Sequence, residues 1–221
     1  RWIARSLGGP QRAQIEAELE MGRLLAQAYE QKVPAAPNNR LDQIAAPLVD
    51  RLRNKQRQYV FKLDQAGAPN ALAIPGGFVY VSESLFDLCG EDHDAIAFVL
   101  AHEIGHCIHG DANKRFLTTA AINALLRMRR PGGSPVVRRL LARLVQQGYS
   151  REQEYRADRF AVALARAAGY DPRGGGRLFA ALQRRTQQGG NPLGAYFASH
   201  PALTERIDRI EERIRALEAK A

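Results

Sequence analysis

The segment His102-Glu103-Ile104-Gly105-His106 has residue types and a spacing that suit metal-dependent hydrolysis. In a helix, His102 and His106 lie one turn apart on the same face, so both imidazoles can reach one metal ion. Glu103 sits beside them, where its carboxylate can take a proton from water activated by that metal. The surrounding apolar residues predict a buried helix; they are Ala95, Ile96, Phe98, Val99, Leu100, Ile104 and Ile108. The segment therefore predicts a catalytic zinc site on a core helix.

A catalytic zinc ion needs a third protein ligand and an open fourth position. His109 lies on roughly the same helical face as His102 but about 10 Å further along the axis, and three ligands from one straight helix cannot easily surround a tetrahedral ion. The extended HExxHxxGxxH pattern also fails, because position 109 is His and position 112 is Ala112. His200 is a second candidate, isolated in sequence.

Glu154 is the third candidate, in a segment that opens a strong helix running to about Gly169. Glu154 and Asp158 are one turn apart, so one carboxylate can bind the metal while the other accepts the ring N–H of a ligand histidine. Apolar residues give this helix a buried side, with the two carboxylates at its margin. We therefore expect Glu154 to be the third ligand, and a solvated charged face is the alternative reading.

The HExxH helix followed by the ExxxD helix resembles the gluzincin metallopeptidases of peptidase family M48, related to HtpX and the CAAX prenyl proteases. The similarity covers most of residues 40–210 and is closest to the soluble BepA-like branch. Residues 70–81 resemble the hairpin ahead of the catalytic helix, and residues 168–172 follow the ExxxD helix as they do in that branch. Ser199-His200-Pro201, followed by Arg206, resembles the branch's C-terminal signature.

This resemblance implies an α+β, predominantly helical, zincin-like fold with a small β-hairpin or sheet. It implies one Zn²⁺ ion per chain, bound by His102, His106 and Glu154, with Asp158 orienting a ligand histidine. The activity implied is that of a zinc metalloendopeptidase, in which Glu103 acts as general base and then as proton donor to the leaving amine.

The resemblance also places His200 over the active site, where two roles are open. Together with Arg206, His200 can stabilise the oxyanion of the transition state. Alternatively, its imidazole fills the fourth zinc position and excludes water until substrate displaces it.

A peptide substrate is expected to add as a strand against the hairpin, at Phe78, Val79, Tyr80 and Val81, through its backbone. Such recognition suits unfolded or misassembled polypeptides, and the resemblance implies protein quality control in the bacterial periplasm or cell envelope. The mitochondrial inner membrane is the alternative location. The chain begins at Arg1 rather than Met, which is consistent with an export signal or membrane anchor that has been cut away. The rival function is a non-catalytic chaperone or binding module with a structural zinc site, which would not need Glu103.

Positive charge is concentrated between the two motif helices. The chain has 32 Lys and Arg against 23 Asp and Glu, a net charge of +9, and residues 112–151 hold nine basic and no acidic residues. An ordinary amphipathic hairpin explains this pattern, and a surface for anionic membrane lipid, or a cover over the active-site cleft, is the functional alternative. Nucleic acid is a poor partner, because neither an aromatic stacking platform nor a known binding motif accompanies the arginines. The oligomeric state is not indicated.

The predicted organisation is an N-terminal helix and linker over 1–37, then a peptidase domain over 38–221 with a basic helical insertion at 112–149 and a last helix at 201–220. Other expected helices span about 11–31, 41–57, 82–88 and 172–188. Expected strands span 59–63, 72–74 and 78–81. Leu203, Ile207, Ile210, Ile214 and Leu217 form a heptad-like stripe, expected to pack on the domain. Cys107 is expected to be a buried hydrophobe rather than bonded to Cys89.

Overall fold

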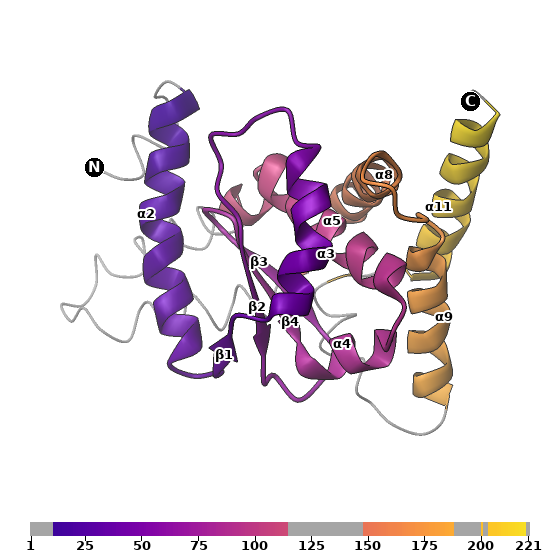
Figure 1. Cartoon of the computed structure of the whole chain (residues 1–221), viewed down its shortest axis with the longest axis horizontal. Coiled ribbons are helices and arrows are strands. Elements are labelled where there is room, and N and C mark those ends of the chain that lie inside the picture. The colour runs from indigo at the N-terminus through magenta and orange to yellow at the C-terminus, as the bar shows by residue number, and fades with distance from the viewer. Residues whose placement is uncertain (1–10, 115–147, 188–199, 201–202, 220–221) are drawn as a thin grey trace.

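A computed structural model of the chain describes residues 11–114, 148–187, 200 and 203–219 (Figure 1). Its strands are β1 (Ala35–Ala36), β2 (Val60–Asp64), β3 (Ala71–Ile74) and β4 (Phe78–Ser82). Its helices are α2 (Gln11–Glu30), α3 (Asn39–Asp50), α4 (Glu83–Cys89), α5 (His93–Ile108), α8 (Arg151–Ala167), α9 (Gly174–Gln187) and α11 (Leu203–Glu218). The predicted mostly helical α+β fold is confirmed.

The four strands form one mixed sheet in the order β1-β2-β4-β3. β3 and β4 form the predicted antiparallel hairpin, with Ala71 opposite Val81 and Ile74 opposite Phe78. β4 also pairs in parallel with β2, with Val60 opposite Phe78. β4 is therefore an inner strand, and β3 lies at the edge of the sheet.

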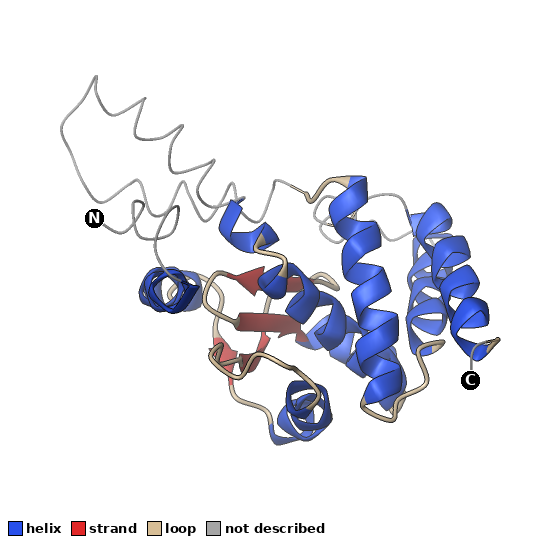
Figure 2. Ribbon diagram, turned by 90° about the horizontal axis from the view of Figure 1, so that it is seen from above, coloured by secondary structure: helices blue, strands red, loops and turns tan. Residues whose placement is uncertain are grey.

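Helices cover both faces of this sheet (Figure 2). Side chains alternate along a strand, and β4 shows this directly: Tyr80 packs with α2, whereas Val79 and Val81 join the main core around α3 and α5. Both faces of the hairpin are thus covered, which explains why all four residues of β3 are buried.

α5 lies at the centre of the main core, against α3, α8 and α9 (Figure 1). Every residue from Ala95 to Cys107 is buried, as expected for a helix packed on all sides. Asp92 starts this helix, since its side chain accepts a hydrogen bond of 3.0 Å from the Ala95 N–H. The two histidines of the motif are thereby fixed in the interior.

One predicted helix boundary is wrong, and the division of the chain at residue 37 stays a prediction. Residues 34–37 contain β1, and α2 packs on the hairpin through Leu25, Ala26 and Tyr29. The second helix ends at Asp50 rather than near 57, because the chain turns there and the Lys55 ammonium donates to the carbonyl oxygens of Val49 and Asp50. Those bonds satisfy carbonyls at a helix end.

The expected basic insertion falls mainly on residues 115–147, which lie outside the described residues, so its helical structure stays a prediction. α11 does pack on the domain: Ile210 and Ile214 belong to the main core, and Ile207 and Leu217 border it. Cys89 and Cys107 are free thiols. Among the described helices, none has the length and apolar character needed to cross a bilayer.

Candidate metal centre

His102 and His106 project side by side from α5. Both are buried, and their Nε2 atoms are 3.1 Å apart. Gly105, between them, allows α8 to cross α5 closely: a Cβ there would lie 3.2 Å from the Phe160 ring and 3.4 Å from the Ala157 Cα. The glycine of the motif thus brings the second helix within reach of the histidines.

Glu154 reaches the histidine pair from the first turn of α8. Its Oε1 lies 3.2 Å from His106 Nε2, and its Oε2 lies 3.6 Å from His102 Nε2. A capping box starts the helix: the Ser150 hydroxyl accepts from the Gln153 N–H, and the Gln153 side chain accepts from the Ser150 N–H. Because Glu154 follows Gln153 directly, this cap fixes where the carboxylate enters the core.

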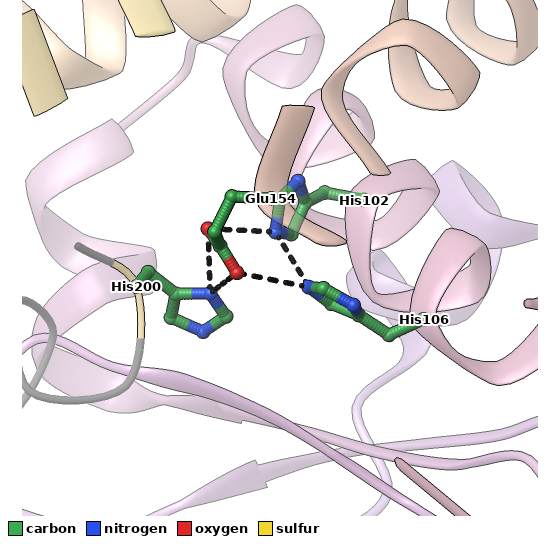
Figure 3. A group of neighbouring side chains, drawn as sticks. All are labelled: His102, His106, Glu154 and His200. Atoms are coloured by element: carbon green, nitrogen blue, oxygen red, sulfur yellow. Dashed lines mark hydrogen bonds and ion pairs between the residues drawn. The ribbon is translucent and has the colours of Figure 1, made fainter. Parts of the chain in front are cut away.

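His200 completes a cluster of four side chains, shown in Figure 3. Its Nδ1 lies 3.1 Å and 3.2 Å from the two oxygens of Glu154. One donor atom from each of His102, His106, Glu154 and His200 lies within 4.8 Å of the others, and all four residues are buried. The structure thus brings together the three predicted ligands and the alternative candidate His200.

This donor set fits zinc. Zinc–nitrogen and zinc–oxygen bonds of about 2.1 Å in a tetrahedron imply ligand atoms about 3.4 Å apart. The separations of 3.1, 3.2 and 3.6 Å among His102, His106 and Glu154 bracket that value. Three imidazoles and one carboxylate also suit zinc, whereas the hard cations calcium and magnesium are bound by oxygen ligands alone.

Asp158 and Arg206 lie behind these ligands. Asp158 Oδ1 is 2.9 Å from His102 Nδ1, the position from which a carboxylate orients a ligand histidine. Arg206 donates Nε and Nη2 to Asp158, each at 2.8 Å, and its Nη1 contacts Glu154 Oε2. Arg206 is fully buried and its guanidinium is engaged by two carboxylates, and its predicted oxyanion role stays a prediction.

The surroundings of the cluster favour the ionised form of Glu154, which can bind a metal, but they favour the protonated form of His106, which cannot. Burial alone would raise the pKa of Glu154, but the charges of His200 and Arg206 hold it well below its usual range. Burial would lower the pKa of His106, yet hydrogen bonds to Asp111 and Glu154 raise it to about 9. A metal bound at His106 must therefore displace a proton.

Glu103 is buried beside the cluster, with its Oε1 3.6 Å from His200 Nε2. His109, the rejected ligand candidate, caps α5 and directs its ring against the edge of Phe160, outside the cluster. Sequence reasoning missed two neighbours of His106. Asp111 contacts its Nδ1 and Tyr149 stacks on its ring. Asp111 directly follows Gly110, and glycine is a residue type that commonly ends helices, which is the signal that the sequence offers.

The predicted substrate strand needs correction. Phe78, Val79, Tyr80 and Val81 belong to β4, and both edges of β4 are paired, with β2 and with β3. An added strand cannot pair with them. Among the described strands, the outer edge of β3 (Ala71–Ile74) lacks a partner, and the Ala71 carbonyl lies 3.4 Å from His200 Nε2. The edge next to the cluster is therefore that of β3.

Comparison with known proteins agrees with this geometry. The model of "Peptidase family M48" matches residues 35–214. The chain belongs to peptidase family M48. This M48 chain is 28% identical over 202 residues to metalloprotease LoiP of Escherichia coli, a match covering 86% of this chain and 77% of LoiP.

Two further relatives are longer proteins. Mitochondrial metalloendopeptidase OMA1 of Schizosaccharomyces pombe is 30% identical over 148 residues, covering 65% of this chain and 43% of OMA1. A putative beta-barrel assembly-enhancing protease of Vibrio cholerae is 27% identical over 191 residues, covering 80% of this chain and 39% of the relative. The chain thus spans less than half the length of these two M48 relatives.

Proposed function

We propose that this M48 chain is a zinc-dependent metalloendopeptidase. The observation that carries the proposal is the buried cluster of His102, His106, Glu154 and His200 with Glu103 beside it. Bound there by His102, His106 and Glu154, zinc would supply Lewis-acid activation of water and of the scissile carbonyl. A purely structural zinc site would have no use for Glu103, which is why we favour an enzyme over a chaperone or binding module.

Glu103 is the proposed general base. Its carboxylate takes a proton from the attacking water and passes it to the leaving amine, so the group returns to its starting state after each turnover. The buried position of Glu103 suits this work, because water excluded from the site cannot compete for the proton. His200, 3.6 Å from it, is placed to influence the same step.

His200 has a proposed resting role. Its imidazole faces the Glu154 carboxylate within the four-donor cluster, so it can occupy the fourth ligand position that water needs. We favour this role over oxyanion stabilisation because His200 lies among the ligands themselves. Substrate would then have to displace His200 before hydrolysis.

The substrate is proposed to add as a strand on β3. The outer edge of β3 pairs with no other described strand, and Ala71 at its start lies beside His200. A peptide that reached this buried edge and paired there would therefore pass the cluster. Backbone pairing needs an extended chain more than particular side chains. Unfolded or misassembled polypeptides are therefore the proposed substrates.

The proposed cellular role is protein quality control in a bacterial periplasm or cell envelope, with the mitochondrial inner membrane as the alternative. The names of the V. cholerae and S. pombe relatives, an assembly-enhancing protease and a mitochondrial endopeptidase, support these two options. The net charge of residues 112–151 supports an anionic membrane surface as a partner. We expect binding to anionic liposomes that weakens with salt and is absent for neutral liposomes; equal binding to both would contradict it.

The enzymatic proposal is tested with Glu103→Gln. This change keeps the size of the side chain but removes the base, so we expect zinc binding to persist while cleavage of unfolded casein falls by about 10²–10⁴-fold. Glu152→Gln, an exposed carboxylate on α8, is the matched control and should cleave like the wild type. Undiminished cleavage by Glu103→Gln would contradict the enzyme, and undiminished activity in cells would favour the chaperone.

A further inference from the structure

One edge of the His106 imidazole faces the ligand cluster, and two further residues, Asp111 and Tyr149, contact the rest of the ring. Asp111 Oδ2 lies 3.3 Å from Nδ1. The Tyr149 ring stacks on the imidazole, with centroids 3.6 Å apart and planes inclined by 11°. His106, Asp111 and Tyr149 are all buried. Nε2 is thereby directed at Glu154 and His102.

Asp111 reaches His106 only because α5 ends between them. In a continuous helix, a residue five positions on would lie about 140° around the axis and face away. Gly110 breaks the helix with a φ of +68°, a conformation that favours glycine. Its N–H still donates to the Cys107 carbonyl, and its own carbonyl accepts from the Lys114 N–H. This turn brings the Asp111 carboxylate to the Nδ1 edge of the His106 ring.

The carboxylate of Asp111 is itself fixed from α8. Its Oδ1 accepts a hydrogen bond of 3.0 Å from Gln153 Nε2 and a charged one from Arg156. The same Gln153 amide accepts, through its Oε1, from the Ser150 N–H in the capping box. One side chain therefore ties the start of α8 to Asp111, and Arg156 balances the buried negative charge.

The start of α8 also supplies the stacking ring. Tyr149 directly precedes the N-cap Ser150, and Glu154 lies four residues beyond it. The cap that places Glu154 against His106 Nε2 thus places Tyr149 against the face of the same ring. His102 has a corresponding arrangement on the other side, where Asp158 is held by Arg206.

We propose that Asp111 and Tyr149 are positioning residues for His106, an inference that rests on the proposed zinc function. A neutral imidazole can carry its proton on either nitrogen, and only the nitrogen without it binds a metal. Asp111 accepts the proton on Nδ1 and leaves the Nε2 lone pair for zinc. Tyr149 fixes the plane of the ring, so that this lone pair points at the cluster.

The test is zinc affinity, measured on metal-free protein by competition with a chromophoric chelator. Asp111→Ala and Asp111→Asn should weaken zinc binding by about 10–100-fold. Tyr149→Phe keeps the stacking ring and should bind like the wild type, whereas Tyr149→Leu should bind more weakly. The absorption spectrum of cobalt-loaded Asp111→Asn should also differ from that of the wild type, because the geometry around the metal changes.

Asp64→Asn is the control for loss of a buried carboxylate. Asp64 is buried and accepts a hydrogen bond of 2.7 Å from Tyr29, outside the ligand cluster. It should lower stability without changing the zinc affinity of the folded protein. Wild-type affinity in Asp111→Asn and Tyr149→Leu would overturn the positioning role. A wild-type protein that binds no zinc would instead overturn the proposed function.

Discussion

The buried carboxylates of Glu154 and Asp158 lie against the guanidinium of Arg206 and against histidine rings. Glu154 faces His200 and Arg206, and Asp158 lies between His102 and Arg206. Isolated buried charges are costly, so such pairing is required for them to stay ionised. The ligands are therefore preorganised by the fold, and a metal ion enters a site whose side chains already face one another.

His200→Ala tests the proposed resting role of that imidazole. Removing a group that blocks the fourth position should increase the rate at which unfolded substrate is hydrolysed, with zinc content unchanged. The rate of casein cleavage and the zinc content per chain are the measurements. A fall in turnover of roughly 10²-fold or more would contradict this role and favour an oxyanion donor.

His93→Ala is the matched control for His200→Ala. His93 is a half-exposed histidine at the start of α5, nine residues before His102 and outside the ligand cluster. Its loss should leave cleavage at the wild-type rate. If His200→Ala leaves both turnover and zinc affinity unchanged, the blocking role and the oxyanion role are both contradicted.

At the scale of elements, close helix packing holds α5 in place. α9 begins with three consecutive glycines, and the first two lie against α5. A Cβ at Gly174 would come within 2.4 Å of the Asp94 carbonyl carbon, and one at Gly175 within 2.8 Å of the Phe98 ring. Phe98 is one turn before His102, so this contact supports the helix that carries the ligands.

Gly174→Ala should therefore destabilise the protein by about 1–3 kcal/mol, because backbone atoms of α5 cannot move aside cheaply. Gly176→Ala is the control: nothing lies within 4 Å of a Cβ there, and alanine should stabilise the helix by about 0.4–1 kcal/mol. Urea unfolding of the metal-free proteins measures both. Equal stability of the two variants would show that the contact does not matter.

The elements that the sequence predicted well are those with strong local signals. The apolar residues throughout its sequence predict that α5 is a buried helix. Capping residues and one apolar side predict α8. The strand order could not be predicted in this way, because β2 pairs in parallel with β4 and β3 lies between them in the sequence. A parallel pair of this kind has no turn motif that would reveal it. The sequence therefore does not show that both edges of β4 are paired.

At the scale of the whole molecule, the site is assembled from distant parts of the chain. His102 and Glu154 could be related through two motifs with the same helical spacing. The contacts of Asp111 and Tyr149 with His106, and the burial of Arg206 between two carboxylates, depend on how α5, α8 and α11 pack. Periodicity along one helix carries no information about such contacts between helices.

Removal of the metal tests whether catalysis depends on zinc. We predict that the protein holds about one zinc per chain, that exhaustive chelation abolishes cleavage of unfolded casein, and that added zinc restores it. The ligands His102, His106 and Glu154 are shared between two helices, so zinc should also raise the thermal unfolding temperature. Casein cleavage that survives complete removal of zinc would contradict zinc-dependent catalysis.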